Sequence, residues 1–572
     1  MSNSDIVDTI ELTAKLLELH NEDEFRIKTY TNAAYNLDKY VGELSQLDFP
    51  QLTQIQGVGK MMAGKILEMV STGQLRDLQD LLAKTPEGVI EMFKIKGLGA
   101  KKIKVLWNEL GIDNLNELQI ACENGSISKV KGFGGKTQES ILESLKFIQS
   151  QAGKLRMDKA AILAEIILEE LKKSFDKVEI SGQVRRKSET VDTLTFLAAY
   201  TDSLPDFTAE GFIKDEKTSS PFVWRGKFLE NKISIEIRYV AENELLNKQF
   251  VYTANENHLK HRNESGVSLL SVALSTILAN GLTEGLTQDA AETAIYEKFG
   301  VPYIIPEMRE GVNEFDWIKK NKNEDLVTWD SLKGILHNHS TYSDGQHSLE
   351  QMATYCKELG FEYLGIADHS QSATYASGLL ITKVQQQHAE IEQLNKKLSA
   401  DRPFKILKGI ESDILGDGSL DYPDEVLASF DYIVASVHSN LTMNQARATE
   451  RLVRAIENPY TTILGHPTGR LLLSRQGYPI DYKEVIDCCA ANGVVIEINA
   501  SPYRLDLDWR WIEYALDRNV MLSINPDAHE MQGYHDMHYG VAAARKGGLT
   551  KNMTFNALSL VEIEEYLGRR KK

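Results

Sequence analysis

The pattern of apolar and polar positions divides the 572-residue chain into three regions. Before residue 150, apolar side chains recur at helical spacing after each of three short turns that contain glycine, which predicts helices. In the middle region, short apolar runs such as ISIEIRYV (233–240) indicate strands. Beyond residue 332, short apolar runs alternate mostly with helical patterns. A chain of this length is expected to form roughly two to four domains.

The C-terminal region contains seven such runs, each with the length of a buried strand. They are GILHNH, YLGIADHS, KILKGIES, YIVASVHS, TILGHP, VVIEINAS and MLSINPDAH. Strands that alternate with helices form a parallel sheet, and seven units predict a closed or nearly closed (β/α)7 barrel. In such a barrel, the side chains that carry out chemistry gather at the carboxyl ends of the strands.

Six of the seven runs end in a residue that can bind a metal ion. One histidine at a strand end is more often a hydrogen-bonded core residue, but six histidines and three carboxylates on one face predict a metal centre. Imidazole and carboxylate suit Zn²⁺, Mn²⁺ or Fe²⁺. The expected ligands are His337, His339, Asp344, His369, Glu411, His438, His466, Asp527 and His529. Other expected site residues are Arg470, Arg475 and Arg504, which can bind phosphate, and Tyr375 and Asn499, which can line the pocket.

A repeated motif marks the N-terminal region: IQGVGKMMAGKIL (55–67), IKGLGAKKIKVL (95–106) and VKGFGGKTQESIL (130–142). The glycines permit a tight turn and a close backbone approach, and the unpaired amides at the start of the next helix suit a phosphate oxygen. A plain helix–turn–helix with a glycine cap would explain one copy, whereas three copies favour binding to a phosphate backbone. The expected contacts to this backbone, which the resemblance described next implies is that of DNA, are Gly57, Gly59, Lys60, Lys65, Gly97, Gly99, Lys101, Lys102, Gly132, Gly134 and Lys136.

These turns resemble the helix-hairpin-helix motif of DNA repair proteins, which holds the phosphate backbone without reading sequence. The stretch ISGQVRRKSETVDTLTFLAAY (180–200) is similar to the family X DNA polymerases, relatives of polymerase beta. The similarity continues through FVYTANENHLKHRNES (250–265) and EKFGVPYIIPEMREG (297–311). It implies an α+β nucleotidyltransferase-like palm and a thumb. It also places Lys65 where the family's lyase helix carries its Schiff-base lysine, although a phosphate contact is the simpler role.

The acids of the family X polymerase site are missing from the matching positions. The paired aspartates fall at Thr193 and Thr195 and the third acid at Glu236, whereas Arg185 and Arg186 of the triphosphate-binding stretch are present. Two hydroxyl groups carry no negative charge, and one glutamate does not hold two Mg²⁺ ions. We therefore expect a degenerate palm with no Mg²⁺ site and little or no nucleotide addition. A misaligned strand, with weak gap-filling activity retained, is the alternative.

The C-terminal ligand set resembles that of the PHP (polymerase and histidinol phosphatase) domain. This resemblance implies three divalent ions, Mn²⁺ or Zn²⁺ or else Fe²⁺. By resemblance, one ion is held by His337, His339, Glu411 and Asp527, a second by Glu411, His438 and His466, and a third by Asp344, His369 and His529.

Together, these similarities are to bacterial family X DNA polymerases that carry a C-terminal PHP domain. They imply a base-excision-repair enzyme with metal-dependent 3′–5′ exonuclease or 3′-end phosphodiesterase activity. Its substrate would be gapped, nicked or 3′-ended DNA of any sequence, and it would act as a monomer. A phosphatase of the histidinol-phosphate type and a DNA-end-binding scaffold with structural metals are the other hypotheses. The three hairpins disfavour the first, and open strand ends disfavour the second.

Charge and cysteine content add two limits. The net charge of −18 argues against wholesale coating of nucleic acid but permits local contacts through basic patches or backbone amides. Four cysteines without disulfide or zinc-finger spacing indicate a reducing, cytoplasmic location, and no membrane helix is expected. The expected domains are a helix-hairpin-helix domain (1–85), a fingers-like domain (86–150), a palm (151–240), a thumb (241–312), a linker (313–332) and a PHP domain (333–572).

Overall fold

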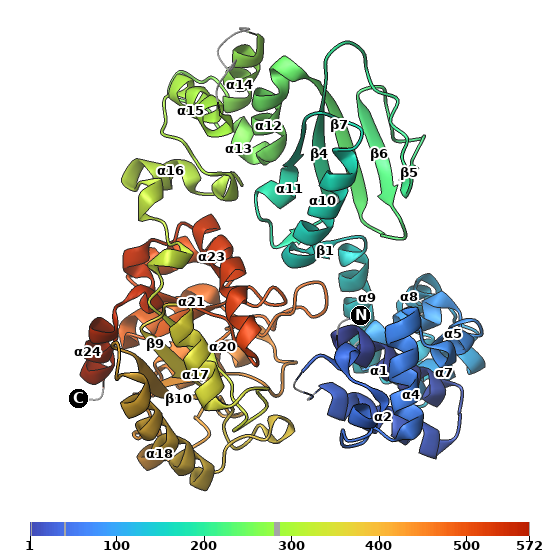
Figure 1. The fold of residues 1–572 in the computed structure, drawn as a ribbon, viewed down its shortest axis with the longest axis vertical. Coiled ribbons are helices and arrows are strands. Elements are labelled where there is room, and N and C mark those ends of the chain that lie inside the picture. Colours follow the sequence, from blue (N-terminus) through green and yellow to red (C-terminus); the bar gives the residue numbers. More distant parts are fainter. Residues whose placement is uncertain (2, 39, 41, 96, 279–286, 571–572) are drawn as a thin grey trace. The chain divides into compact units, whose positions relative to one another are not determined.

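The computed structural model describes residues 1, 3–38, 40, 42–95, 97–278 and 287–570. Residues 279–286 of the expected thumb therefore lie outside the described residues. The chain forms two compact units, Met1–Ala152 and Gly153–Lys572, which are described separately (Figure 1). Within the described part of the chain, no helix combines the length and the apolar character needed to cross a bilayer.

The first unit is helical, as its periodicity predicts. Its amphipathic helices bury one face each in a common core; in α4, the buried residues Met62, Ala63, Ile66 and Met69 recur at spacings of three and four. The helices are α1 (Asn3–Leu19), α2 (Glu24–Asp38), α3 (Phe49–Leu52), α4 (Lys60–Thr72), α5 (Arg76–Leu82), α6 (Glu87–Glu91), α7 (Ala100–Lys104), α8 (Leu115–Glu123) and α9 (Gly135–Gln151).

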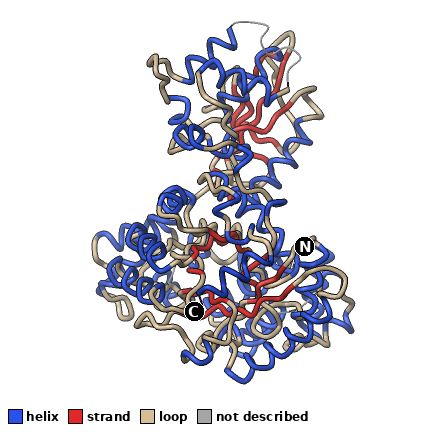
Figure 2. The backbone as a smooth tube through the Cα atoms, turned by 90° about the vertical axis from the view of Figure 1, so that its left-hand side faces the viewer, coloured by secondary structure: helices blue, strands red, loops and turns tan. Residues whose placement is uncertain are grey.

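The second unit begins with a palm-like α+β region. Its five-stranded sheet has the order β2-β4-β7-β6-β5 and combines one parallel pair, β4 with β7, with antiparallel neighbours (Figure 2, strands in red). The apolar face of α10 (Met157–Leu171) packs on this sheet. The remaining elements are β1 (Leu155–Arg156), β2 (Val178–Ser181), α11 (Gly182–Arg185), β3 (Thr190–Val191), β4 (Thr193–Tyr200), β5 (Phe212–Lys214), β6 (Val223–Phe228) and β7 (Ser234–Ala241).

A helical thumb-like region and a packed connection follow the palm. The helices are α12 (Leu245–Thr253), α13 (Glu256–Lys260), α14 (Leu269–Leu278), α15 (Gln288–Phe299) and α16 (Glu314–Lys320). Helix α16 lies in the segment expected as a linker, but its Phe315, Trp317 and Ile318 are buried. The Trp317 Nε1 donates to the carbonyl of Gly548 at 2.9 Å. This segment is therefore fixed by packing rather than extended through solvent.

The C-terminal region is a seven-stranded parallel barrel, which confirms the predicted fold class. Its strands are β8 (Gly334–Asn338), β9 (Tyr363–Ile366), β10 (Lys405–Asp413), β11 (Tyr432–Ser436), β12 (Ile463–Leu464), β13 (Val495–Asn499) and β14 (Leu522–Asn525), paired in sequence order. A bridge between Asn338 and Ala528, with the His339 amide donating to the Ala528 carbonyl at 2.8 Å, nearly closes the barrel.

Helices cover the outside of the barrel. They are α17 (Leu349–Glu358), α18 (Ile381–Leu398), α19 (Asp424–Leu427), α20 (Gln445–Ile456), α21 (Tyr482–Asn492), α22 (Ile512–Asp517), α23 (Met537–Lys546) and α24 (Leu560–Arg570). Every residue of β8, β9, β11, β13 and β14 is buried, because the helices and the barrel interior cover both faces of each strand. This burial explains why the strands read as continuous apolar runs.

Candidate metal centre and nucleic-acid interface

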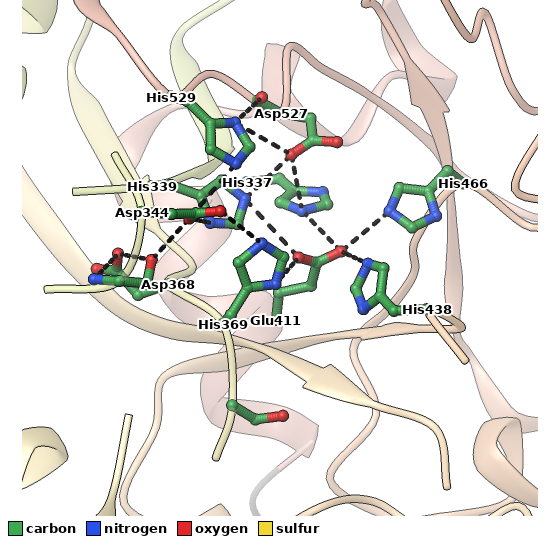
Figure 3. Close-up of polar contacts among 12 residues, drawn as sticks. His337, His339, Asp344, Asp368, His369, Glu411, His438, His466, Asp527 and His529 are labelled. Carbon is green, nitrogen blue, oxygen red and sulfur yellow. Dashed lines mark hydrogen bonds and ion pairs between the residues drawn. The ribbon is translucent and has the colours of Figure 1, made fainter. Parts of the chain in front are cut away.

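The carboxyl ends of the barrel strands bring all nine predicted ligands into one cluster (Figure 3). The clustered side chains come from β8 and the loop after it, from the segments that follow β9, β11, β12 and β14, and from β10 itself. Their donor atoms form four overlapping groups in which all atoms lie within 4.8 Å of one another. Side chains from residue 337 to residue 529 thus share one centre because parallel strands end at the same rim.

Glu411 occupies the middle of this cluster (Figure 3). Its Oε1 lies 3.2 Å from His337 Nε2, 3.2 Å from His438 Nε2 and 3.0 Å from His466 Nε2. Its Oε2 lies 2.9 Å from His369 Nδ1. His339 Nε2 also lies 3.7 Å from Oε2. One carboxylate therefore faces five imidazoles, which is the arrangement expected of a ligand shared between metal ions.

Asp344 and Asp527 border the other side of the cluster. The carboxylate of Asp344 lies 3.5 Å from His529 Nε2, 3.6 Å from His369 Nε2 and 3.9 Å from His339 Nδ1. Asp527 Oδ1 lies 3.0 Å from His339 Nε2. The two carboxylates thus share His339 between them.

The grouping of donor atoms differs in part from the partition that the PHP resemblance implies. The groups are His339–Asp344–His369–His529, His337–His339–Asp527, His337–Glu411–His466 and His369–Glu411–His438. His438 and His466, which were expected on the same ion, fall into separate groups that share Glu411. The assignment of each ligand to an ion therefore remains a prediction.

Buried polar atoms in the cluster fit a set of metal ions. His337 Nε2, His339 Nδ1, His369 Nδ1 and Glu411 Oε2 are buried, and none of the described residues gives them a well-aligned hydrogen bond. Leaving such atoms unsatisfied costs free energy, unless another partner completes them. Imidazole nitrogens with carboxylate oxygens are ligands that suit Zn²⁺, Mn²⁺ or Fe²⁺. These residues therefore fit a centre that holds divalent metal ions.

Without metal, the electrostatics of the cluster differ between its ligands. Burial alone would lower the pKa of His438 and His529, but the neighbouring carboxylates raise it to about 10 and about 9, so a cation must displace protons from these two rings. Burial, together with the charges of His529 and His369, lowers the pKa of His339 to about 3. Burial alone would raise the pKa of Glu411, but the surrounding imidazoles, His438 foremost, hold it well below its usual range. A neutral imidazole thus stands beside an ionised carboxylate, and both have lone pairs available for a cation.

Two carboxylates that the sequence analysis did not single out contact the Nδ1 atoms of two predicted ligands, His337 and His438. Glu497 in β13 accepts a hydrogen bond from His337 Nδ1 at 2.5 Å and another from Asn525 Nδ2 at 2.9 Å. Asp413 in β10 lies 2.6 Å from His438 Nδ1. Such partners fix the ring orientation and the tautomer of a ligating histidine. The signal for Glu497 was an acid in the middle of the apolar run VVIEINAS.

The two residues expected to line the pocket lie beside the ligands. The Asn499 amide donates to Asp527 Oδ2 at 3.1 Å. The Tyr375 ring lies 6.0 Å from the ring of His369 and 6.5 Å from that of His438, yet its residue is 60% exposed. Tyr375 therefore stands at the open side of the centre.

Of the predicted phosphate-binding arginines, Arg504 lies beside the centre. Its Nε is 3.6 Å from Asp527 Oδ2, and its side chain is 20% exposed. Arg475 donates through Nε and Nη2 to the Gly469 carbonyl, at 3.1 and 2.7 Å. Burial, and next the charge of Arg504, lower the pKa of Arg475. The two guanidinium groups therefore form a positive region at one side of the cluster.

Arg470, the third predicted phosphate-binding arginine, is engaged within the protein. Its Nη1 pairs with Asp508 at 2.8 Å, its Nε donates to the Arg504 carbonyl at 2.9 Å, and its Nη2 donates to the Leu505 carbonyl. All three nitrogens thus serve the loop that carries Arg504. These contacts disfavour a phosphate-binding role for Arg470, which stays a prediction.

In the first unit, the three hairpins share one backbone geometry. The first glycines have φ of 79°, 83° and 94°, a region that favours glycine. These are Gly57, Gly97 and Gly132. The second glycines, which precede α4, α7 and α9, have ordinary extended conformations, and a Cβ built on them meets no atom within 4 Å. These are Gly59, Gly99 and Gly134. A residue with a Cβ would therefore fit at the second position of each turn without backbone strain or a clash inside the protein.

The hairpin lysines differ in their surroundings. Lys60, Lys101 and Lys136 are exposed at the beginnings of α4, α7 and α9. Lys102 is partly buried and donates to the carbonyl of Gly97 in its own turn at 3.0 Å. The exposed lysines remain placed to contact a phosphate.

Lys65 is engaged by an acid rather than presented to solvent. Its Nζ lies 2.6 Å from Asp77 Oδ2, and Arg26 Nη2 lies 2.9 Å from the same oxygen, which also accepts a hydrogen bond from Tyr30. Burial would raise the pKa of Asp77, but the hydrogen bonds from Lys65, Tyr30 and Arg26 lower it to about 2. The Lys65 Nζ is therefore occupied by a partner within the protein, whereas a Schiff-base nucleophile must reach the carbon it attacks. The structure therefore gives no support to the lyase role.

The palm positions equivalent to polymerase acids are neutralised. Thr193 and Thr195 lie on β4, with Thr195 directly opposite Glu236 on β7. Glu236 pairs with Arg225 at 2.8 Å and with Arg238 at 2.6 Å. None of the groups of metal-binding side chains found among the described residues includes Glu236. Its carboxylate is thus committed to two guanidinium groups.

The arginines of the triphosphate-binding stretch serve the thumb-like region. Arg185 Nη1 lies 2.6 Å from Glu292 Oε1. Arg186 Nε lies 3.0 Å from Glu310 Oε1, and its Nη1 donates to the Thr253 carbonyl at 2.6 Å. Both side chains therefore link the palm to the helices that follow it.

Comparisons with known proteins agree with these features. Models of a helix-hairpin-helix domain, a SAM-like helix-hairpin-helix tandem and a PHP domain match residues 1–75, 89–146 and 336–501. A probable phosphatase of Thermoanaerobacter sp. (strain X514) is 24% identical over 254 residues, which cover 42% of this chain and 97% of that protein.

A relative from Bacillus subtilis (strain 168), the DNA polymerase/3′-5′ exonuclease PolX, matches far more of the chain. It is 34% identical over 585 residues, which cover 100% of both proteins. The match thus extends through the hairpin unit, the palm and the metal-binding barrel alike. The chain therefore belongs to the PolX family, the bacterial family X DNA polymerases with a C-terminal PHP domain.

Proposed function

We propose that this protein is a DNA-repair enzyme whose PHP domain removes nucleotides from the 3′ ends of DNA. The observation that carries the proposal is the cluster of six histidines and three carboxylates around Glu411, open to solvent beside Arg504 and Tyr375. The full-length relative that is named a 3′-5′ exonuclease supports the same activity. We further propose that three divalent ions, Mn²⁺ or Zn²⁺ or else Fe²⁺, occupy the cluster.

The residues of the chain divide the work of phosphodiester hydrolysis. The nine clustered side chains hold the metal ions, and Glu497 and Asp413 orient His337 and His438 for this purpose. Bound divalent cations neutralise phosphoryl oxygens and make an attacking water more acidic. Arg504 contributes a fixed positive charge to the phosphate that is cleaved. No protein nucleophile is required.

In this proposal, the three hairpins bind the DNA backbone. Each second glycine leaves open space before a helix that begins with unpaired amides, so a sugar–phosphate backbone can approach closely. Contacts of this kind position the duplex and do not read its bases. Gapped or nicked DNA with a 3′ end is the substrate we propose, bound by a monomer.

We also propose that nucleotide addition is weak or absent. Glu236 is paired with two arginines, and two threonines replace the other acids, so the palm offers little negative charge for Mg²⁺. Primer extension on a gapped duplex with Mg²⁺ or Mn²⁺ tests this proposal. Robust extension would contradict it.

A small-molecule phosphatase is the second candidate, because relatives named probable phosphatases match 42% and 28% of the chain. The same ligands would serve phosphomonoesters. Such an enzyme has no use for three hairpins, which is why we place this candidate second.

One experiment separates these functions. A 5′-labelled gapped duplex and a generic phosphomonoester are incubated separately with Mn²⁺ and wild-type protein or the His337→Ala/His339→Ala variant. We expect a ladder of shortened DNA strands that the variant does not produce. Monoester hydrolysis without shortening would favour the phosphatase, and DNA binding without either reaction would favour a scaffold.

A further inference from the structure

The loop that carries Arg504 is held from two sides, by the barrel and by the palm. On the barrel side, Arg470 donates to the carbonyls of Arg504 and Leu505, and the Leu472 amide donates to the Tyr503 carbonyl at 2.6 Å. These contacts fix the inner edge of residues 501–508, which we call the arginine loop. The outer edge is covered by residues of the palm, which contribute nothing to the metal cluster.

Arg156, in β1 of the palm, packs directly on the arginine loop. Its guanidinium carbon lies 3.6 Å from the centre of the Tyr503 ring, the residue next to Arg504. Asp158 accepts two hydrogen bonds from the same guanidinium, at 3.2 and 3.1 Å, and so holds its plane against the ring. Tyr503 is otherwise 49% exposed, so this stack is a main restraint on its position.

Met157 adds a hydrophobic restraint to the next residues of the loop. It belongs to a small buried cluster with Leu505, Ala542 and Ala543. Leu505 has a φ of 44°, a conformation that is unfavourable for a residue with a Cβ. Such a conformation persists only where the surroundings hold it. Removing the palm side of this cluster would therefore release the turn that follows Arg504.

We propose that the palm positions Arg504 for the reaction in the barrel, with Arg156 as the positioning residue. Tyr503 and Leu505 are the neighbours of Arg504 on both sides, and both pack on the palm. The inference rests on the proposed phosphodiesterase function. It gives the palm a role that needs none of the missing polymerase acids.

Steady-state kinetics on a 5′-labelled DNA strand with Mn²⁺ test the coupling between Arg156 and Arg504. We expect Arg156→Ala to lower kcat about tenfold, since small displacements of a positioned group carry costs of this size. In an Arg504→Ala background, Arg156→Ala should have almost no further effect. Arg156→Lys, which keeps the charge, should recover part of the loss. Equal losses in both backgrounds would overturn the proposal.

A matched control excludes a general effect on the palm. Arg238 also stacks on a tyrosine, Tyr252, with 4.3 Å from its guanidinium carbon to the ring centre, and pairs with a carboxylate, that of Glu236. Because these partners lie in the palm and the following helix, Arg238→Ala should leave kcat unchanged. A tenfold loss in Arg238→Ala would contradict a specific role for Arg156.

Hydrogen exchange measured by mass spectrometry tests the same inference without any activity. The Leu505 and Leu507 amides donate to the carbonyls of Ser501 and Glu497, at 3.1 and 3.0 Å. Arg156→Ala should accelerate exchange in the peptide that contains them, whereas Arg238→Ala should not. Unchanged exchange would overturn the inference even if the wild type cleaves DNA. A wild type that does not shorten DNA would instead count against the proposed function.

Discussion

Replacing Glu497 by glutamine tests whether the cluster binds metal and whether Glu497 orients His337 for that role. The carboxylate is fully buried and accepts hydrogen bonds from His337 Nδ1 at 2.5 Å and Asn525 Nδ2 at 2.9 Å through one oxygen. Its other oxygen accepts from Asn499 Nδ2 at 3.0 Å and from the His466 amide at 3.2 Å. Glutamine has one oxygen, so either orientation of its amide deprives two of these four donors of an acceptor.

The magnitude follows from those lost contacts. A hydrogen bond to a charged group contributes about 1.5–3 kcal/mol, and removing the outer partner of a metal ligand weakens metal affinity or activity about 10–100-fold. We therefore expect Glu497→Gln to raise the Mn²⁺ concentration needed for half-maximal DNA cleavage by about 10–100-fold, which is roughly 1.4–2.7 kcal/mol. The initial rate of cleavage as a function of Mn²⁺ concentration measures this shift.

The same substitution at the surface of the barrel provides the control. Glu392 in α18 is 63% exposed and pairs only at the surface with Lys408, at 2.7 Å. Glu392→Gln should keep the wild-type Mn²⁺ dependence. A Glu497→Gln protein that folds and responds to Mn²⁺ within twofold of the wild type would refute the reasoning about His337.

Three further predictions concern other parts of the chain. Gly134→Ala should weaken binding to a gapped duplex, measured by fluorescence anisotropy, without loss of stability. Gly132→Ala, at a φ of 94°, should instead destabilise the protein by about 1–2 kcal/mol. An equal loss of stability in both variants would contradict this. Burial would raise the pKa of Glu292, but the charge of Arg309 and further contacts lower it to about 2. The stability that this group contributes is therefore present above pH 4.5 and is lost as the pH falls towards 2, by about 3 kcal/mol in total. In unfolding followed by circular dichroism, the free energy of unfolding of Glu292→Gln should fall less steeply with acid than that of the wild type. An equal fall in both proteins would disprove it. Tyr375→Ala should slow cleavage of DNA more than that of bis(p-nitrophenyl) phosphate, because only DNA offers a base to stack on the ring; an equal loss on both substrates would exclude this role.

The sequence predicted the barrel and its cluster because both follow from simple regularities. Parallel strands buried on both faces read as short apolar runs, and ligands at their ends follow the runs directly, as His369 and His438 do. Glu497 escaped notice because it lies inside its strand rather than at the end. Its role depends on a contact with His337, 160 residues away, which no local pattern reveals.

Charged side chains outside the cluster were harder to predict. Arg470 and Lys65 are residue types that often bind phosphate. In this protein, however, Arg470 pairs with Asp508 and Lys65 pairs with Asp77. An isolated arginine or lysine in a sequence does not show whether an acid from another element reaches it first. Arg504 differs only in that its nearest acid, Asp527, is itself part of the cluster.

The most direct test of the account is a crystal of the full-length protein soaked with Mn²⁺, measured at a wavelength where manganese scatters anomalously. We predict strong anomalous peaks at bonding distance, about 2.0–2.3 Å, from the carboxylate of Glu411 and the imidazoles that surround it. Anomalous density that is absent from this cluster in a crystal that diffracts well would contradict the account.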